Sequence, residues 1–181
     1  MRLVILDRDG VINYESDAYI KSPEEWIPIP RSLDAIARLH RAGFSVTVAT
    51  NQAGVARGLF DLATLDAIHH KMRGAVEQAG GHLAGVFVCP HAPWDNCACR
   101  KPKPGLMQQI AARFQTDMKG IPAIGDSQRD IRAAQAVAAR PILVRTGRGK
   151  ETLQQLPPSS RIEVFADLAA VADHLLAEIR T

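Results

Sequence analysis

Two acidic residues, separated by one residue, follow a short apolar run near the start of the chain. Asp7 and Asp9 come directly after Leu3–Leu6, and Gly10 follows them. Side chains two positions apart in extended backbone project in the same direction, so the two carboxylates are expected to lie close together. One could attack phosphorus as a nucleophile, and the other could protonate a leaving alkoxide and then activate water. A strand-end turn that carries two solvated acids would show the same pattern.

Further polar residues stand where other apolar runs end. Thr50 and Asn51 close one run and could hydrogen-bond a phosphoryl oxygen. Asp126 follows another run and adds a carboxylate oxygen of the kind that Mg²⁺ binds. Arg100 and Lys101 begin a proline-containing basic segment that could offset phosphate charge. Each feature alone also fits a polar strand terminus or a solvated loop, but together they predict a phosphoryl-transfer site.

A third group combines three cysteines with a histidine. Cys89 and His91 form C-x-H, and Cys97 and Cys99 form C-x-C after a gap of five residues. Three thiolates and one imidazole can complete the tetrahedral coordination of structural Zn²⁺, which leaves no open position for catalysis. We therefore predict a structural zinc site, located just before Arg100. The alternative is a loop of reduced cysteines beside an unrelated histidine.

These groups need elements that bring them together, and the apolar pattern predicts an α/β fold. Apolar runs typical of strands buried on both faces alternate with helical patterns. The predicted strands are 3–6, 45–50, 86–88, 123–125, 142–144 and 163–165, and the predicted helical stripes are 33–40, 62–79, 106–114, 131–137 and 168–179. We predict a Rossmann-like, open and mainly parallel sheet with helices on both faces, and Asp167 as the N-cap of the last helix. Ligands of such sheets bind beyond the carboxyl ends of the strands, where the polar residues stand.

Length and composition limit the protein class. The chain has 181 residues, 46% of them hydrophobic, and a formal net charge of +3, which predicts one domain over residues 1–181 with its zinc-binding loop at 89–99. About forty residues separate Gly10 from Thr50, and a helix and a strand use most of them, so we predict no large cap domain. Aromatic residues are 5% of the chain and no long basic run is present, which argues against nucleic-acid binding. No signal peptide or membrane span is predicted, and we expect a cytoplasmic location and no membrane partner.

The combination of Asp7-x-Asp9-Gly10, Thr50-Asn51, Arg100-Lys101-Pro102 and Gly125-Asp126 resembles the haloacid-dehalogenase-like phosphatase superfamily. The resemblance implies that Asp7 is the nucleophile and Asp9 the general acid and base. It implies that catalytic Mg²⁺ is held by the Asp7 carboxylate, the Asp9 main-chain carbonyl and Asp126. Thr50 and Lys101 would hold the phosphoryl group. An aspartate at position 9 favours phosphate over carbon–halogen chemistry, because an alkoxide leaving group needs a proton.

The segments 50–58, 97–105 and 143–147, together with the zinc loop, resemble a narrower family that acts on heptose 1,7-bisphosphate. This implies removal of the 7-phosphate, in nucleotide-heptose and lipopolysaccharide core biosynthesis, by a monomer. Arg100 is the candidate for binding the second phosphate, since a guanidinium matches phosphate geometry. Asn51 is a further candidate contact for the substrate. Ser127 stands where that family often has lysine.

Several alternatives stay open at this point. The substrate could be histidinol phosphate or another small sugar phosphate, and the anomer preference is not readable. Lys103 is the alternative to Lys101, and the role of Asp130 is open. Arg57 and the segment 145–150 are weaker candidates for the second phosphate and are interpreted as surface charges. The histidines outside the zinc loop, His69 among them, are interpreted as structural or exposed.

Two classes of non-enzyme protein share parts of this pattern. A phospho-acceptor receiver also places acidic residues at strand ends, but it would keep a long-lived aspartyl-phosphate that Asp9 is placed to hydrolyse. A zinc-containing nucleic-acid binder would need a basic face with interleaved aromatic residues.

Overall fold

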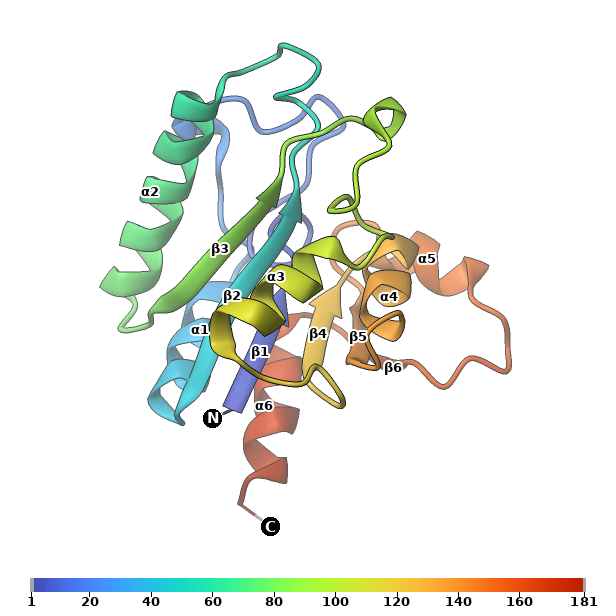
Figure 1. Ribbon diagram of the computed structural model, residues 1–181. Helices are drawn as coiled ribbons and strands as arrows, with labels where there is room; N and C mark the ends of the chain where they lie inside the picture. The colour runs from blue at the N-terminus through green and yellow to red at the C-terminus, as the bar shows by residue number, and fades with distance from the viewer. Residues whose placement is uncertain (1, 181) are drawn as a thin grey trace.

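One six-stranded sheet forms the centre of the computed structural model, which describes residues 2–180 (Figure 1). The strands are β1 (Arg2–Leu6), β2 (Phe44–Asn51), β3 (Leu83–Cys89), β4 (Pro122–Gly125), β5 (Arg140–Val144) and β6 (Glu163–Phe165). Their order across the sheet is β3-β2-β1-β4-β5-β6, and every one of these neighbouring pairs is parallel. The sheet is therefore of the doubly wound kind, with β1 at its centre.

The residues of β1 show why the strands read as continuous apolar runs. Val4 and Leu6 belong to one hydrophobic cluster, while Leu3 and Ile5 belong to another. Alternate side chains of a strand point to opposite faces, so the two clusters lie on the two faces of the sheet. Both faces of β1 are buried from Leu3 to Leu6, so the polar side chains that reach the cleft come after the carboxyl end of the strand.

Helices cover both faces of the sheet. The helices are α1 (Ser32–Arg41), α2 (Leu62–Gln78), α3 (Gly105–Phe114), α4 (Gln128–Gln135), α5 (Gly149–Gln155) and α6 (Leu168–Glu178), with short 3₁₀ helices η1 (Pro23–Glu25) and η2 (Pro93–Asp95). Buried residues of α1, α2 and α6 contribute to one cluster, and those of α3 and α4 to the other. Asp167 caps α6, as predicted, by accepting a hydrogen bond from the main-chain N–H of Ala170 at 2.8 Å.

The strand order changes direction at β1, and this decides where the functional residues meet. The chain moves from β1 outward to β2 and β3, then crosses to β4 on the other side of β1. The main-chain N–H of Asp7 still pairs with Ile124 O at 2.8 Å, so β1 and β4 end side by side. In open α/β sheets, such a switch point opens a crevice beyond the carboxyl ends of the strands.

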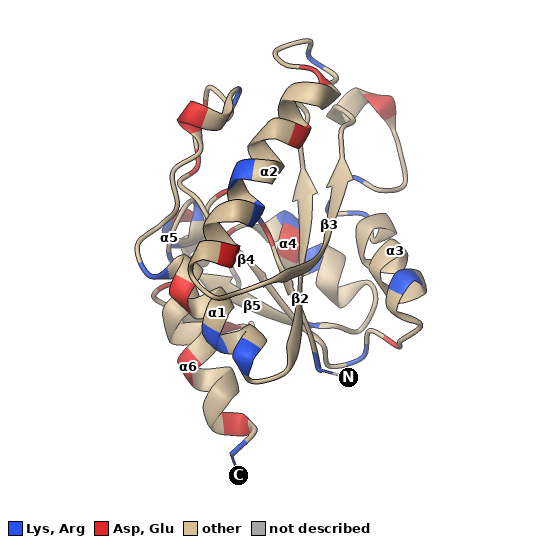
Figure 2. Ribbon diagram, turned by 90° about the vertical axis from the view of Figure 1, so that its left-hand side faces the viewer, with Lys and Arg blue, Asp and Glu red and all other residues tan. Residues whose placement is uncertain are grey.

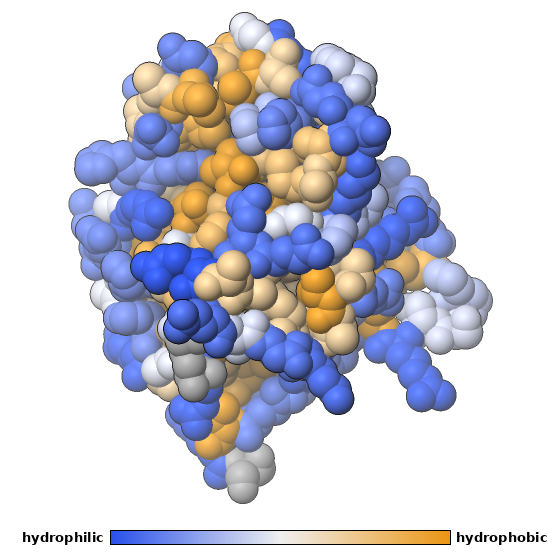
Figure 3. All heavy atoms as spheres, viewed as in Figure 1, coloured by the Kyte–Doolittle hydropathy of each residue, from blue (hydrophilic) through white to orange (hydrophobic). Residues whose placement is uncertain are grey.

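The predicted fold class is confirmed, with a parallel sheet, helices on both faces and no large cap within residues 2–180. All six predicted strands are present, although five of them are one to four residues longer than predicted. Helix α5 was not predicted, because its seven residues GKETLQQ form no apolar stripe. None of the helices within residues 2–180 is long and apolar enough to cross a membrane. On the face shown in Figure 3, hydrophilic side chains surround smaller hydrophobic areas.

Candidate active site

Three carboxylates meet at the switch point. Asp7 follows β1, Asp126 follows β4 and Asp130 lies in the first turn of α4, and one oxygen from each lies within 4.8 Å of the others. Burial raises the pKa of Asp7 to about 7 and that of Asp126 to about 8. The negative charges of the neighbouring carboxylates raise both pKa values as well. The protein supplies less positive charge than this cluster needs. Carboxylate oxygens are the donors that Mg²⁺ prefers, so this donor set fits Mg²⁺.

Lys101 is the cation that the protein itself places in this cluster. Its Nζ lies 3.0 Å from Asp7 Oδ1 and 2.6 Å from Asp130 Oδ1, and it donates to Ala49 O at 2.7 Å. The side chain is 3% exposed, so these three oxygens account for its ammonium group. Opposite charges at this distance hold the pKa of Lys101 above its usual value although burial opposes this.

Two glycines allow the loop that carries Asp7 to approach Asp126. Gly10 and Gly147 both have positive φ, and a Cβ on either would lie within about 2.2 Å of Asp126 Oδ2. Thr146 Oγ1 donates to Gly10 O at 2.6 Å, and the main-chain N–H of Arg148 donates to Asp126 Oδ2 at 2.8 Å. The segment after β5 is therefore packed directly against the loop that carries Asp7.

The carboxylate of Asp9 is surrounded by hydrogen-bond donors. Arg8 donates to Asp9 Oδ1 from Nε at 3.1 Å and from Nη2 at 2.8 Å, and Asn13 Nδ2 donates to the same oxygen at 2.8 Å. Gln52 Nε2 donates to Asp9 Oδ2 at 2.9 Å. Burial opposes ionisation, but the charge of Arg8 and these hydrogen bonds hold the pKa of Asp9 below its ordinary value.

The end of β2 contributes Thr50 and Asn51 in different ways. Thr50 is fully buried, and its hydroxyl accepts a hydrogen bond from Gln52 Nε2 at 2.8 Å. Asn51 lines the cleft, and its side chain holds the main chain of Lys101: Nδ2 donates to Lys101 O at 3.0 Å, and Oδ1 accepts from Lys101 N at 3.1 Å. Asn51 therefore positions the residue that contacts Asp7.

A cleft of roughly 340 Å³ opens above these residues. Asp7, Asp9, Asn51, Lys101, Asp126 and Asp130 line it, together with Glu15, Asp17, Tyr19 and the arginines Arg57, Arg100, Arg129 and Arg148. Arg148 is neutralised by Glu15 at 2.8 Å and by Asp17 at 2.9 Å. Within residues 2–180, the other three arginines form no ion pair with a carboxylate. Arg57 and Arg148, predicted as surface charges or weaker candidates for phosphate binding, are both exposed, and both line the cleft.

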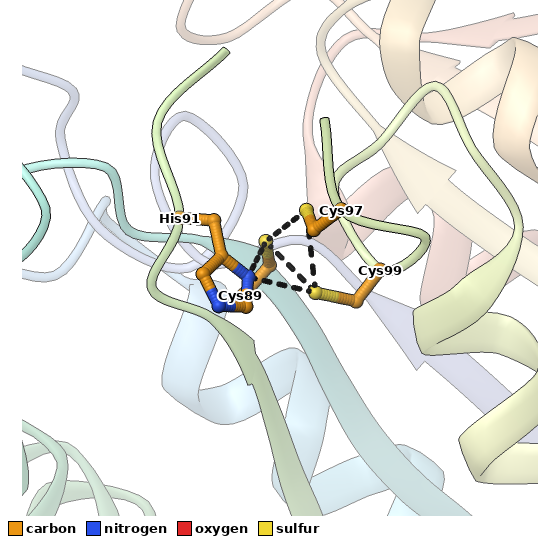
Figure 4. Close-up of side chains that lie close together, drawn as sticks. All are labelled: Cys89, His91, Cys97 and Cys99. Atoms are coloured by element: carbon orange, nitrogen blue, oxygen red, sulfur yellow. Dashed lines mark hydrogen bonds between the residues drawn. The ribbon is translucent and has the colours of Figure 1, made fainter. Parts of the chain in front are cut away.

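The four predicted zinc ligands converge at the end of β3 (Figure 4). The Sγ atoms of Cys89, Cys97 and Cys99 lie 3.1 to 3.6 Å apart, and His91 Nδ1 lies 3.6 Å from Cys89 Sγ and 3.3 Å from Cys99 Sγ. Donors about 2.3 Å from a tetrahedral ion are separated by about 3.8 Å. The donor set and its spacing therefore fit one Zn²⁺.

The predicted zinc loop is joined to the cleft through Arg100. The main-chain N–H of Arg100 donates to Cys97 Sγ at 3.4 Å, and its Nη1 donates to His91 O at 3.2 Å. Burial, followed by the nearby charge of Arg129, holds the pKa of Arg100 below its usual value. Lys103 does not reach Asp7: its Nζ donates to Cys97 O at 3.0 Å and to Asn96 Oδ1 at 2.8 Å.

Sequence reasoning missed four residues of the site: Arg8, Asn13, Gln52 and Arg129. It left the role of Asp130 open, although the pattern Ser127-x-x-Asp130 is a helix-start signal that could have placed it. In the structure, Asp130 Oδ2 accepts from Ser127 N at 3.0 Å and from Ser127 Oγ at 2.6 Å. The other oxygen of Asp130 is the one that contacts Lys101.

Comparisons with known proteins extend over almost the whole chain. A family model described as HAD-hydrolase-like matches residues 98–171. The D-glycero-β-D-manno-heptose-1,7-bisphosphate 7-phosphatase of Bordetella bronchiseptica is 57% identical over 98% of this chain and 99% of its own length. The protein of the same name from Pseudomonas putida is 53% identical over 97% of this chain and 100% of its own length.

A solved structure of the same family is similar to this chain over almost its whole length. The D,D-heptose 1,7-bisphosphate phosphatase from B. bronchiseptica, complexed with magnesium and phosphate, superposes with a TM-score of 0.96 and is 56% identical. The match covers 98% of this chain and 99% of that one. The similarity therefore includes the sheet, the cleft and the loops around it.

Proposed function

The chain belongs to the D-glycero-β-D-manno-heptose-1,7-bisphosphate 7-phosphatase family of haloacid-dehalogenase-like hydrolases, and we propose that it removes the 7-phosphate of that sugar bisphosphate. The observation that carries the proposal is the cluster of Asp7, Asp126 and Lys101 in the cleft of a chain so similar to these relatives. The names of both relatives specify the β anomer, and we propose the same preference here. We place the reaction in nucleotide-heptose and lipopolysaccharide core biosynthesis, in a monomeric, cytoplasmic protein.

In the first half-reaction, an oxygen of Asp7 attacks the phosphorus of the 7-phosphate. The bond between phosphorus and the C7 oxygen breaks, its electron pair stays on that oxygen, and Asp9 in its protonated form supplies the proton. The products are heptose 1-phosphate and an aspartyl-phosphate on Asp7. Lys101, which lies 3.0 Å from Asp7 Oδ1, offsets negative charge as the phosphoryl group is transferred.

In the second half-reaction, water attacks the same phosphorus and gives a proton to the carboxylate of Asp9. The bond between phosphorus and the Asp7 oxygen breaks, which releases phosphate and restores the Asp7 carboxylate. Asp9 is again protonated and ready for the next molecule of substrate. The donors around Asp9 stabilise the carboxylate form that this half-reaction requires.

Mg²⁺ fits the remaining donors of the site. We propose that the Asp7 carboxylate, the Asp9 main-chain carbonyl and Asp126 hold it, and the B. bronchiseptica relative was solved with magnesium and phosphate. When bound, Mg²⁺ neutralises phosphoryl charge and orients the group for attack. We also propose one structural Zn²⁺ on Cys89, His91, Cys97 and Cys99, supported by their convergence and by a donor set that leaves no open position.

We propose that Arg100 binds the second phosphate of the substrate. Its guanidinium lines the cleft, carries no carboxylate partner within the described residues and is fixed by the zinc loop. A planar guanidinium can donate two parallel hydrogen bonds to a phosphate. Thr50 and Asn51, which were expected to contact the substrate, are used in the structure to hold Gln52 and Lys101.

A panel of substrates tests the proposal. Steady-state phosphate release with Mg²⁺ is measured for the β and α anomers of the heptose bisphosphate, for histidinol phosphate and for simple sugar phosphates. We expect the highest kcat/KM for the β bisphosphate, and for Arg100→Ala a larger rise in KM for the bisphosphate than for a monophosphate. A higher kcat/KM for histidinol phosphate than for the heptose bisphosphate would contradict the proposed substrate.

The two non-enzyme classes are not supported. The chain belongs to a family of phosphatases rather than of signalling receivers, and Asp9 stands beside the nucleophile. The positions of Lys and Arg are scattered among those of Asp and Glu over the ribbon in Figure 2, whereas a nucleic-acid interface needs basic residues gathered on one face.

A further inference from the structure

A buried arginine between the two catalytic aspartates has no part in the reaction described above. The side chain of Arg8 is 0% exposed. Its Nε and Nη2 face the Asp9 carboxylate, while its Nη1 lies 3.1 Å from His69 Nε2 in α2. The guanidinium is thus held between a carboxylate from the active-site loop and an imidazole from a helix 61 residues further along the chain.

The chemistry of the pair fixes the protonation state of His69. A guanidinium can only donate hydrogen bonds, so His69 Nε2 accepts the one from Arg8 Nη1. The imidazole must therefore be neutral, with its proton on Nδ1. Burial, together with the charge of Arg8, lowers the pKa of His69 to about 3, which agrees with this geometry.

A neutral His69 cannot balance the charge of Arg8, and Asp9 already does so. His69 instead fixes the orientation of the Arg8 guanidinium. With Nη1 bonded to His69, all three guanidinium nitrogens have a partner, and the plane cannot rotate away from Asp9. A lysine in place of Arg8 would have no such rigid fork. Asn13 and Gln52 hold the two oxygens of Asp9 from other sides.

We propose that Arg8 and His69 are a pair of positioning residues that keep the Asp9 carboxyl in the orientation needed for proton transfer to the leaving oxygen. The inference rests on the proposed function, in which Asp9 is the general acid. Neither side chain touches the substrate in this account. His69 acts only through Arg8, and Arg8 only through Asp9.

The leaving group distinguishes positioning of an acid from simple packing. The C7 alkoxide of a sugar is a poor leaving group and needs a proton, whereas p-nitrophenolate leaves without one. A misplaced Asp9 must therefore slow cleavage of the heptose bisphosphate more than cleavage of p-nitrophenyl phosphate. General damage to the site slows both equally.

The experiment compares His69→Leu and His69→Gln in single-turnover reactions with Mg²⁺ and enzyme in excess, where the appearance of the alcohol reports the first half-reaction alone. His69→Leu removes the acceptor for Arg8, and His69→Gln keeps one. We expect His69→Leu to slow release of heptose 1-phosphate by about 10- to 100-fold, within the range that general acids contribute. For p-nitrophenol release we expect a loss of less than about threefold, and His69→Gln should restore most of the rate with the sugar.

Met72→Ala supplies the matched control, because Met72 is buried in α2, as His69 is, but forms no hydrogen bond with Arg8 within the described residues. It should lower the thermal unfolding temperature without changing the ratio of the two rates. Equal losses with both substrates in His69→Leu, or no loss in either, would overturn the positioning role. Failure of the proposed function is seen separately, in the wild-type chain, as lack of turnover of the heptose bisphosphate; the ratio is then measured with an alkyl phosphate that the wild-type chain does cleave.

Discussion

The side chain of Asn51 holds both main-chain groups of Lys101, with Nδ2 donating to Lys101 O at 3.0 Å and Oδ1 accepting from Lys101 N at 3.1 Å. This pair of hydrogen bonds joins the end of β2 to the segment that follows the zinc loop. Together with the hydrogen bond from Lys101 Nζ to Ala49 O, it fixes the cation beside Asp7 to β2.

Asn51→Ala should therefore reduce activity without removing any group that contacts the phosphate. Lys101 would keep its ammonium group but lose the support of its main chain. We expect kcat to fall by about 10- to 100-fold, by analogy with the loss of residues that orient metal ligands. The measurement is phosphate release at saturating substrate, with zinc content determined in parallel. An unchanged kcat would show that Lys101 is held well enough by its other contacts.

The two lysines of the basic segment should differ sharply. Lys101→Met leaves Asp7 and Asp130 without their shared cation, and we expect kcat to fall at least about 100-fold, as for loss of an electrostatic contact in the transition state. Lys103→Met removes only hydrogen bonds to Asn96 and Cys97, and kcat should change by less than about threefold. Comparable losses of kcat in the two variants would contradict the proposal that Lys101, and not Lys103, stabilises the phosphoryl group.

Removal of zinc should act on both stability and activity. Metal analysis is expected to find about one Zn²⁺ per chain, since four protein donors complete its coordination. A chelator, or Cys97→Ser, should lower the thermal unfolding temperature, because binding free energy at such a site is folding free energy. Activity should fall with it, since Arg100 follows the loop directly and donates to Cys97 Sγ. A purified chain without zinc and with full activity would exclude the structural role.

The lowered pKa of His69 predicts that the free energy of unfolding falls in acid. Its pKa is lowered to about 3 in the folded chain, whereas the unfolded value is near 6.5. Between these values the unfolded state binds more protons, so the free energy of unfolding rises with pH and falls on acidification. Arg8 and Arg73 disfavour the charged imidazole, and Asp9 favours it.

Relative to His69→Gln, the wild-type chain should lose about 2 kcal/mol more unfolding free energy between pH 8 and pH 5. Urea unfolding of both proteins at the two pH values measures this difference. Equal losses would mean that His69 titrates normally in the folded chain.

The sequence predicted the sheet and most of the helices because strands buried on both faces must be apolar along their whole length. It also placed Asp7, Asp9 and Asp126 correctly at strand ends, where a polar residue directly follows such a run. Helix α5 could not be predicted from the apolar pattern, because only Gly149 and Thr152 of its residues are buried. A short helix with no apolar stripe leaves no periodic signal.

The contacts around Asp9 could not be predicted in the same way. In an extended strand, Arg8 would point away from Asp9, but the chain turns after β1, with the main-chain N–H of Ile12 bonded to Arg8 O at 2.8 Å. The turn brings both side chains together, and α2 adds His69 from far along the sequence. Such contacts depend on side-chain rotamers and on the packing of distant elements, which no spacing encodes.

The central claim is that Asp7 attacks the 7-phosphate of the heptose bisphosphate, and ³¹P NMR of the reaction tests it most directly. For the wild-type chain with Mg²⁺, we predict one equivalent of inorganic phosphate and one of heptose 1-phosphate, with the signal of the 7-phosphate lost. Asp7→Asn should leave both phosphate signals of the substrate unchanged while the protein remains folded. Release of the 1-phosphate by the wild-type chain, or continued turnover by Asp7→Asn, would contradict the account.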